Sequence, residues 1–178
     1  MESHKHLRRL DEIWVEAPIY FITTCTSNRT KLLATAEVAA ILVDEWRTAD
    51  PRHGWVVGRY VIMPDHVHFF CTPRPDAKTL SEFVRLWKQW TTKRIRSSVA
   101  ALVKRGSVLS GTEPRLTSAA TDAIWQREFF DHVLRSNESY EEKWSYVRQN
   151  PVRAGLVARA DEWLFQGEIQ ALEFLSDR

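Results

Sequence analysis

The sequence has little cysteine, glycine and proline, and it lacks a long apolar run. Its 178 residues include 2 Cys, 6 Gly and 7 Pro. Cys25 and Cys71 are far apart, so we expect neither a disulfide framework nor a Cys-x-x-Cys metal site. Low Gly and Pro content excludes a collagen-like or low-complexity chain. No segment approaches the roughly 18 apolar residues of a membrane span, and residues 1–9 lack the apolar stretch of a signal peptide. We therefore expect a cytoplasmic protein without a membrane segment.

The sequence also lacks a clear excess of either charge. Lys plus Arg number 25 and Asp plus Glu 23, and the net charge of +2 does not by itself indicate a nucleic-acid-binding protein. The charges are unevenly placed, because residues 78–105 carry eight basic residues and one acidic residue. A solvated helix face and a DNA-binding surface with aromatic platforms both explain such a segment. The candidate DNA contacts are Arg85, Trp87, Lys88, Trp90, Lys93, Arg94 and Arg96 and, later in the chain, Arg127 and Arg148.

The length and the hydrophobic content of 44% predict one domain over residues 1–178, with a core at about 18–157 and a tail at 158–178. Residue patterns predict strands at 18–26, 55–62, 66–72 and 124–130, and helices at 36–46, 78–95 and about 137–150. Residues 106–121 are turn-rich and predict a loop. This order is typical of an α+β fold, the ferredoxin-like split βαβ sheet with helices on one face and an added C-terminal helix.

Two histidines, His66 and His68, are the sharpest local signal for chemistry. They are separated by one residue on a predicted strand, so both side chains project to the same face and can reach one metal ion. A pair of partly buried histidines satisfied by backbone groups explains the same spacing. The His-x-His pair alone therefore does not identify a metal site.

Tyr146 and Asn150 lie four residues apart near the end of the last predicted helix. That spacing places the phenol and the amide on one helix face, where the amide oxygen can complete a metal site beside a reactive tyrosine. Alternatively, Tyr146 packs in the core and Asn150 only ends the helix before Pro151. Gln149 is the neighbouring amide that can take the place of Asn150.

Taken together, four segments resemble the REP-associated tyrosine transposases, a bacterial family within the HUH single-tyrosine transposases that act on single-stranded DNA. The segments occur in the family's order and span residues 20–29, 61–68, 124–135 and 146–157. The resemblance implies that His66 and His68 bind a metal, that Tyr146 is the nucleophile and that Asn150 completes the metal site. The last predicted helix would then carry the catalytic tyrosine.

The resemblance also implies a metal-dependent endonuclease and strand-transferase that uses Mg²⁺ or Mn²⁺ and passes through a 5′-phosphotyrosine intermediate. Its partner would be single-stranded or hairpin DNA of the repetitive extragenic palindrome (REP) type, and the protein would act as a monomer or homodimer. A domesticated DNA-binding module without turnover is the main alternative. A Zn²⁺ enzyme is a third interpretation, and it needs a further ligand such as Asp65 or His53.

Overall fold

The computed structural model describes residues 18–106, 124–172 and 174. Its centre is an antiparallel five-stranded sheet in the order β4-β1-β3-β2-β5. The strands are β1 (Ile19–Cys25), β2 (Trp55–Ile62), β3 (His66–Pro73), β4 (Phe130–Leu134) and β5 (Gln166–Glu168). A helix follows β1 and another follows β3, so the first four strands form the ferredoxin-like α+β arrangement expected from the sequence.

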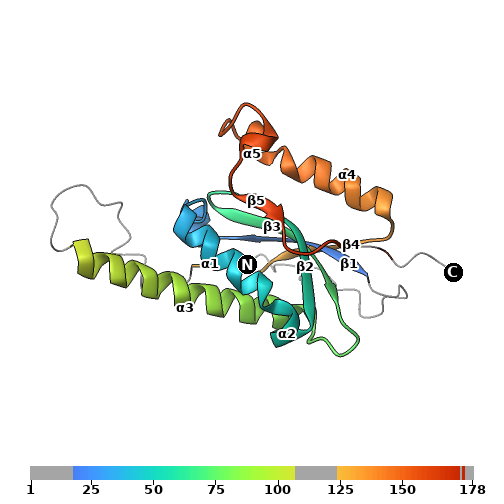
Figure 1. Ribbon diagram of the computed structural model, residues 1–178, viewed down its shortest axis with the longest axis horizontal. Coiled ribbons are helices and arrows are strands. Elements are labelled where there is room, and N and C mark those ends of the chain that lie inside the picture. Colours follow the sequence, from blue (N-terminus) through green and yellow to red (C-terminus); the bar gives the residue numbers. More distant parts are fainter. Residues whose placement is uncertain (1–17, 107–123, 173, 175–178) are drawn as a thin grey trace, which may run out of the picture.

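The helices cover both faces of the sheet (Figure 1). One face carries α1 (Ala36–Arg47), α2 (Ala49–His53) and α3 (Leu80–Gly106). The other face carries α4 (Asn137–Arg148) and the short α5 (Asn150–Arg153). Two 3₁₀ turns, η1 (Ser27–Arg29) and η2 (Ala160–Glu162), lie in the connections. The added helix therefore lies opposite α1 and α3, a placement that the sequence patterns did not predict.

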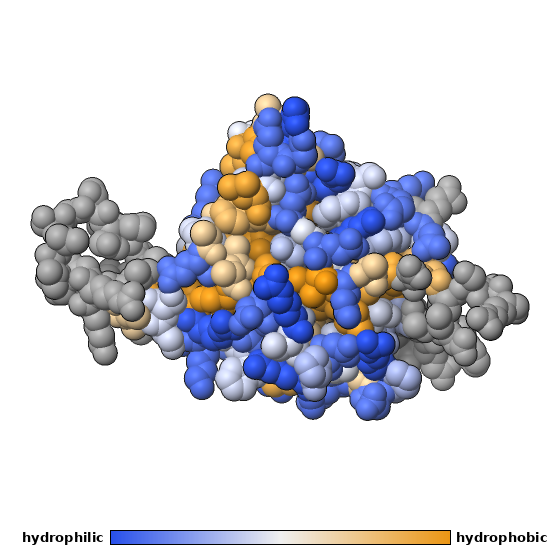
Figure 2. Space-filling model, viewed as in Figure 1, coloured by the Kyte–Doolittle hydropathy of each residue, from blue (hydrophilic) through white to orange (hydrophobic). Residues whose placement is uncertain are grey.

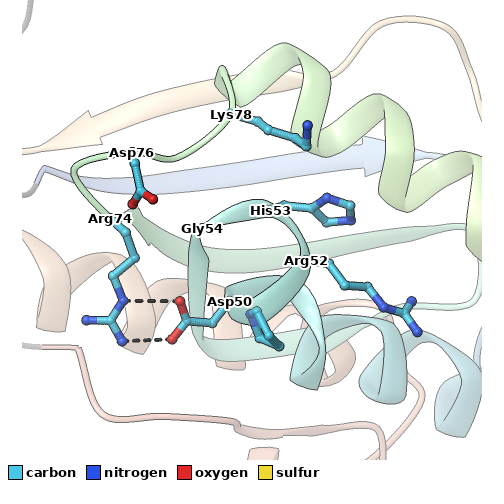
Figure 3. A pocket seen from close by; sticks show the side chains of 8 residues that line it. Asp50, Arg52, His53, Gly54, Arg74, Asp76 and Lys78 are labelled. Atoms are coloured by element: carbon cyan, nitrogen blue, oxygen red, sulfur yellow. Dashed lines mark hydrogen bonds and ion pairs between the residues drawn. The ribbon is translucent and has the colours of Figure 1, made fainter.

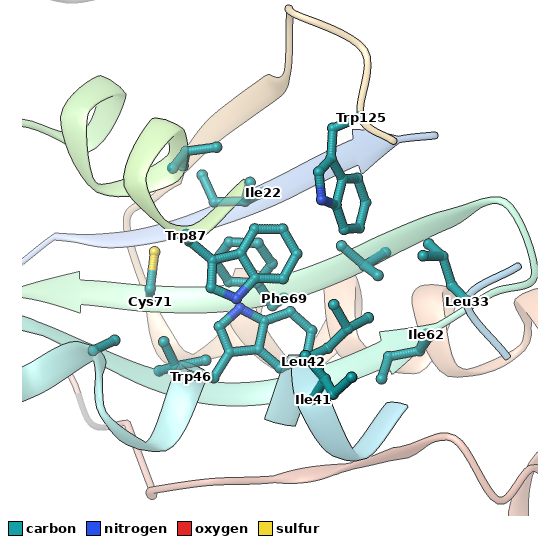
Figure 4. Packing of buried hydrophobic residues seen from close by; sticks show 14 of the residues in the cluster. Ile22, Leu33, Ile41, Leu42, Trp46, Ile62, Phe69, Cys71, Trp87 and Trp125 are labelled. Carbon is teal, nitrogen blue, oxygen red and sulfur yellow. The ribbon is translucent and has the colours of Figure 1, made fainter. Parts of the chain in front are cut away.

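Aromatic residues fill the core between the sheet and the α1–α3 layer (Figure 4). Trp46 of α1 stacks on Trp87 of α3 with ring centroids 5.2 Å apart, and both rings contact Phe69 of β3. Full burial of a large apolar side chain contributes about 1.5–3 kcal/mol to stability. The side chain of Thr35 caps α1 by accepting the backbone N–H of Val38. The apolar face of α3 thus packs into this core and holds the helix against the sheet.

A second, smaller core joins the sheet to α4. Phe70 of β3 packs edge-on against Tyr140 of α4, with centroids 4.8 Å apart. Ser136, the residue before the first residue of α4, is its N-cap. The Ser136 hydroxyl accepts the backbone N–H of Ser139, and the Ser139 hydroxyl accepts the backbone N–H of Ser136. α4 ends at Arg148, close to the expected end near Asn150, and a separate short helix, α5, begins at Asn150, because proline is tolerated in a first helical turn.

The strand predicted at 124–130 is wrong, because β4 begins only at Phe130. Ile124 and Trp125 are buried, but Trp125 makes only an isolated bridge to Thr26. The apolar residues that suggested a strand therefore serve as core side chains of a connection.

The C-terminal segment adds β5 to the edge of β2, which the sequence patterns did not predict. Leu172 then packs on Gly58 of β2, and a Cβ at position 58 would lie only 2.6 Å from the Leu172 side chain. A glycine is required there because the tail approaches the strand so closely. The predicted loop at 106–121 lies almost entirely outside the described residues.

None of the helices in the described part of the chain has both the length and the apolar character needed to span a bilayer. Hydrophilic residues cover most of the face seen in Figure 2. Apolar residues gather there in a band at the level of the sheet, between the α4–α5 layer and the α1–α3 layer.

Candidate active site

His66 opens β3 and is held by the residue before it. Its Nδ1 atom lies 2.7 Å from Oδ1 of Asp65, and Oδ2 of the same carboxylate lies 3.0 Å from Nε of Arg29. One carboxylate therefore links a guanidinium to the imidazole. A carboxylate on one ring nitrogen fixes the orientation of a metal-binding histidine and leaves Nε2 for the ligand.

Arg29 reaches Asp65 from a turn with an unusual backbone. Asn28 and Arg29 have φ values of 53° and 55°, in the left-handed region that costs a residue other than glycine about 1–2 kcal/mol. Thr26 ties this turn to Asp65, because its backbone N–H and its hydroxyl both donate to the Asp65 carbonyl at 2.9 Å. The turn thus holds Arg29 against the carboxylate that orients His66.

His68 points to the same face of the sheet as His66, with ring centroids 4.8 Å apart. Its Nδ1 atom lies 2.8 Å from the hydroxyl oxygen of Thr23, and its ring stacks on Phe21 at 5.4 Å. Val67 between them is fully buried on the other face, as the strand alternation predicts. Both Nδ1 atoms are thus engaged, which leaves the Nε2 atom of each ring for a ligand.

Burial and nearby cations keep both histidines neutral. Burial, and to a smaller extent the nearby charges of His66, Arg153, Arg29 and Lys143, lower the pKa of His68 to about 3. Burial also lowers the pKa of His66, although the carboxylate of Asp65 opposes the shift. Neutral imidazole is the form that binds metal ions. The pair is therefore ready to act as a ligand at neutral pH.

Tyr146 lies on the last turn of α4 with 63% of its surface exposed, so it is not the core residue that the alternative interpretation required. The guanidinium of Arg153 covers its ring, with Cζ 4.1 Å from the ring centroid. The same guanidinium donates hydrogen bonds from Nη2 to the carbonyl oxygen of Tyr146 and to Oδ1 of Asn150. His68 stacks on Phe21, which Lys143 of α4 contacts, so the histidine pair lies on the side of the sheet that carries α4 and Tyr146.

Three cations lie near enough to His68 for their charges to lower its pKa, and we call them the basic rim: Arg29, Lys143 and Arg153. Lys143 of α4 places its Nζ 5.3 Å from the ring centroid of Phe21, the ring on which His68 stacks. Sequence reasoning missed all three. A signal existed for Lys143 and Arg153, because Lys143, Tyr146, Asn150 and Arg153 follow the i, i+3, i+7, i+10 spacing of one helix face.

Two of the predicted DNA contacts on α3 are buried, and the prediction is wrong for them. Trp87 is 1% exposed in the stack with Trp46. Lys88 is 9% exposed, and its Nζ donates to the carbonyl oxygens of Gln126, Arg127 and Glu128 at 2.9, 3.3 and 3.0 Å. Burial lowers the pKa of this ammonium to about 8. Trp87 and Lys88 thus stabilise the core and the approach to β4.

Arg94 is also engaged within the protein, since its Nη1 lies 2.6 Å from Oδ2 of Asp44 and 2.9 Å from Oε1 of Glu45. These ion pairs join α3 to α1. The side chain of Arg94 is still 38% exposed, so its contact with DNA stays a prediction, although two acidic side chains already pair with its charge.

The other predicted contacts on α3 are at the surface. Trp90 is 40% exposed, and Nζ of Lys93 lies 5.1 Å from its ring centroid. Arg85 and Arg96 are exposed as well. However, α3 covers the face of the sheet opposite to α4 (Figure 1), and His68 lies on the α4 side through its stack on Phe21, which Lys143 of α4 contacts. A DNA-binding role for these residues stays a prediction, and it concerns a surface separate from the candidate active site.

The two remaining predicted contacts lie in different places. Arg127 is exposed in the connection before β4. Arg148 ends α4, with its guanidinium 6.0 Å from the ring centroid of Trp144. Arg148 therefore shares the helix of Tyr146, whereas Arg127 does not.

The Zn²⁺ interpretation loses His53 as a further ligand, whereas Asp65 lies beside His66. His53 ends α2 and lines a shallow hollow of about 280 Å³ with Asp50, Gly54, Arg74 and other residues (Figure 3). Arg74 follows the last residue of β3, whereas His66 begins it, so the two ends lie roughly 25 Å apart at the rise of an extended strand. Within the described residues, no group of three His, Cys, Asp or Glu side chains is placed to hold a metal.

Comparisons with known proteins agree with this fold. A family model described as "Transposase IS200 like" matches residues 15–150. A REP-associated tyrosine transposase of Escherichia coli (strain K12) is 23% identical over 158 residues, which is 85% of this chain and 77% of that protein. A putative REP-associated tyrosine transposase of Haemophilus influenzae is 24% identical over 150 residues, or 82% of this chain and 76% of that one.

Solved structures also share the fold. A REP-associated tyrosine transposase bound to a REP hairpin has a TM-score of 0.64 at 19% identity and covers 90% of this chain and 82% of its own. A putative transposase from Deinococcus radiodurans R1 has a TM-score of 0.52 at 19% identity, with 80% and 97% covered. The family model spans most of the sequence, including the histidine pair and Tyr146. The chain therefore belongs to the IS200-like transposase family.

Proposed function

We propose that this protein cleaves and rejoins single-stranded DNA at a REP-like hairpin, with Tyr146 as the nucleophile. One observation carries the proposal: an exposed tyrosine and two neutral histidines share one face, where Arg153 contacts Tyr146 and its charge acts on His68. The family supports a DNA-processing role, and a REP hairpin is bound by the structurally similar transposase.

In the proposed reaction, the energy of the cleaved phosphodiester bond is conserved in a covalent bond between the DNA phosphate and Tyr146. The Tyr146 oxygen attacks the scissile phosphorus and loses its proton, and the bond to the 3′ oxygen breaks to leave a 3′-hydroxyl. The 5′ phosphate then remains on the tyrosine. A 3′-hydroxyl of another strand attacks this phosphotyrosine, and Tyr146 leaves with a proton. The basic rim would stabilise the negative charge that develops on the phosphoryl oxygens in both steps.

A divalent cation, Mg²⁺ or Mn²⁺, is part of this proposal. The residues that would hold it are His66 and His68, through Nε2, and Asn150, through its amide oxygen. Imidazole nitrogens combined with an amide oxygen suit Mn²⁺, with which Mg²⁺ would compete. Bound there, the ion would supply a Lewis acid for the scissile phosphate. The orientation of both rings through their Nδ1 atoms fits such a ligand set.

The DNA would lie on the α4 face, because the basic rim lies near His68 there. Arg148 ends the same helix, but its guanidinium lies against Trp144, so its contact with DNA stays a prediction. The exposed residues of α3 on the opposite face would serve as a second contact only for DNA that extends around the sheet. The cytoplasmic location expected from the sequence stays a prediction.

The decisive experiment incubates an end-labelled hairpin oligonucleotide, carrying a single-stranded flank, with the protein and Mn²⁺. A covalent protein–DNA adduct should appear on a denaturing gel for the wild type and be absent for Tyr146→Phe. Tyr140→Phe is the matched control, because Tyr140 lies on the same helix but is 3% exposed in the core. Absence of an adduct from the wild type, or equal adduct from Tyr146→Phe, contradicts the assignment. If neither the wild type nor the double variant His66→Ala/His68→Ala cleaves the hairpin and both bind it equally well, the protein is instead a DNA-binding module without turnover.

A further inference from the structure

Arg153 makes three separate contacts, all of them with the proposed catalytic groups. Its guanidinium stacks on the Tyr146 ring at 4.1 Å, and one nitrogen, Nη2, donates 2.9 Å to the Tyr146 carbonyl and also to Oδ1 of Asn150. No sequence motif assigned a role to this residue. Its side chain therefore binds the helix turn that carries the nucleophile and the amide that would bind the metal.

These contacts cross the junction between α4 and α5. Tyr146 belongs to the last turn of α4, where backbone carbonyls lack their usual helical partners. Arg153 ends α5 and reaches back across Gln149 and Pro151 to one of those carbonyls. Pro151 is buried and keeps the start of α5 in place. The guanidinium thus contacts both the Tyr146 ring and the Asn150 amide across this junction.

The contacts depend on the shape of the group as well as on its charge. A guanidinium is flat, so it can stack on a phenol while its edge donates hydrogen bonds. A lysine ammonium carries the same charge but lacks the flat face and the fork of donors. Replacement of arginine by lysine therefore separates a positioning role from a simple electrostatic contact with DNA phosphate.

We propose that Arg153 is a positioning residue that holds the Tyr146 ring and the Asn150 amide oxygen together beside His68, ready for strand cleavage. This inference rests on the proposed function, because Tyr146 must be the nucleophile for its position to matter. It adds the residue that couples the nucleophile to the metal-binding amide.

The test compares Arg153→Lys with the wild type in two measurements on the full chain. The rate of adduct formation at saturating hairpin should fall about 10- to 100-fold, the range expected when a reacting group is displaced by about 1 Å. Hairpin affinity should change less than about threefold, because the charge remains. Arg74→Lys is the matched control: Arg74 pairs with Asp50 after the far end of β3, and the variant should keep the wild-type rate. Added guanidinium ion should restore part of the rate of Arg153→Ala, whereas equal NaCl should not.

A second measurement needs neither metal nor DNA. The protein contains four tyrosines, so labelling with 3-fluorotyrosine should give four ¹⁹F resonances, and Tyr146→Phe identifies the one from Tyr146. Arg153→Lys should shift that resonance alone. Broad changes in all four resonances would instead indicate general unfolding and overturn the positioning role.

The outcomes separate this inference from the proposed function. If the wild type forms the adduct and Arg153→Lys keeps both its rate and its Tyr146 resonance, the positioning role is wrong and the proposed function stands. Loss of hairpin affinity with an unchanged rate identifies a phosphate contact and likewise overturns the positioning role. If the wild type forms no adduct, the proposed function fails and this inference fails with it.

Discussion

The carboxylate of Asp65 lies 2.7 Å from Nδ1 of His66, its neighbour in the chain. Burial opposes ionisation of Asp65, but the hydrogen bond and charge of His66 and the charge of Arg29 lower the pKa of this carboxyl. The carboxylate is therefore ionised at neutral pH and accepts a hydrogen bond from the Nδ1–H tautomer of His66. That tautomer presents a lone pair at Nε2, where a metal would bind.

Asp65→Asn should weaken Mn²⁺ binding about 10- to 100-fold, the usual effect of removing a partner that orients a metal-bound histidine. Titration of Mn²⁺ followed by electron paramagnetic resonance measures this affinity directly. Hairpin affinity without metal should stay close to the wild-type value. Asp76→Asn, which changes an exposed acid after the other end of β3, is the control. Equal Mn²⁺ affinity for Asp65→Asn and the wild type would show that Asp65 has no role in metal binding.

Lys88→Met should destabilise the protein by about 2–4 kcal/mol, because three carbonyl oxygens lose their donor at a buried position. Its effect on hairpin affinity at a temperature where the variant is folded should be small. Lys93→Met, five residues further along α3, should leave the free energy of unfolding within about 0.5 kcal/mol of wild type. Urea denaturation and hairpin binding of both variants check this contrast. A stable Lys88→Met protein with weakened DNA binding would restore the interpretation drawn from charge alone.

Lys143→Gln should weaken hairpin binding and lower the salt dependence, because Lys143 belongs to the basic rim on the α4 face. Each phosphate contact that is lost reduces the slope of log affinity against log salt by about 0.7–0.9. Arg85→Gln removes a positive charge from the opposite face of the sheet and should leave the slope unchanged. Affinities measured from about 50 to 200 mM salt cover the useful range. A lower slope for Arg85→Gln with an unchanged slope for Lys143→Gln would place the hairpin on α3.

Tyr140→Phe should remove part of the alkaline instability of the protein. Burial raises the pKa of Tyr140 to about 12, although the nearby charge of Arg59 opposes this shift. In the unfolded chain the phenol ionises near pH 10, so between about pH 10 and 12 only the unfolded state loses the proton. The free energy of unfolding of the wild type then falls by at most about 1.4 kcal/mol per pH unit from this residue.

Urea denaturation of the wild type and of Tyr140→Phe between pH 7 and 11 measures this effect. The difference between the two proteins should be constant up to about pH 9.5 and then shift in favour of the variant. Curves that stay parallel up to pH 11 would mean that Tyr140 ionises equally in both states.

Periodicity predicted the parts of this fold that depend on local sequence. Alternation placed His66 and His68 on one face of a strand and Val67 on the other, and apolar spacing predicted α1 and the first part of α3. Capping residues and Pro151 predicted α4. The same approach failed at residues 124–130, because apolar side chains there enter the core without strand pairing. It also missed β5, a three-residue strand whose pairing with β2 is a long-range contact.

The candidate site was predictable only in part, because spacing is visible in the sequence and burial is not. The spacing of His66 with His68, and of Tyr146 with Asn150, is visible in the sequence, and the structure places all four on the α4 side. Charge counting, in contrast, treats Lys88 and Lys93 alike, although one is buried against three carbonyls and the other is exposed. Which basic residues are free to meet DNA depends on burial.

The sequence by itself determined the strands and helices with a clear hydrophobic period, the histidine pair on one strand face, and the tyrosine and amide on one helix face. These features depend on residues within a few positions of each other, where backbone geometry alone sets the direction of side chains. Only the tertiary structure decided that α4 lies opposite α3, that Asp65 links Arg29 to His66, and that Lys143 and Arg153 join the histidines. Such contacts arise from the packing of distant segments, which no local spacing encodes.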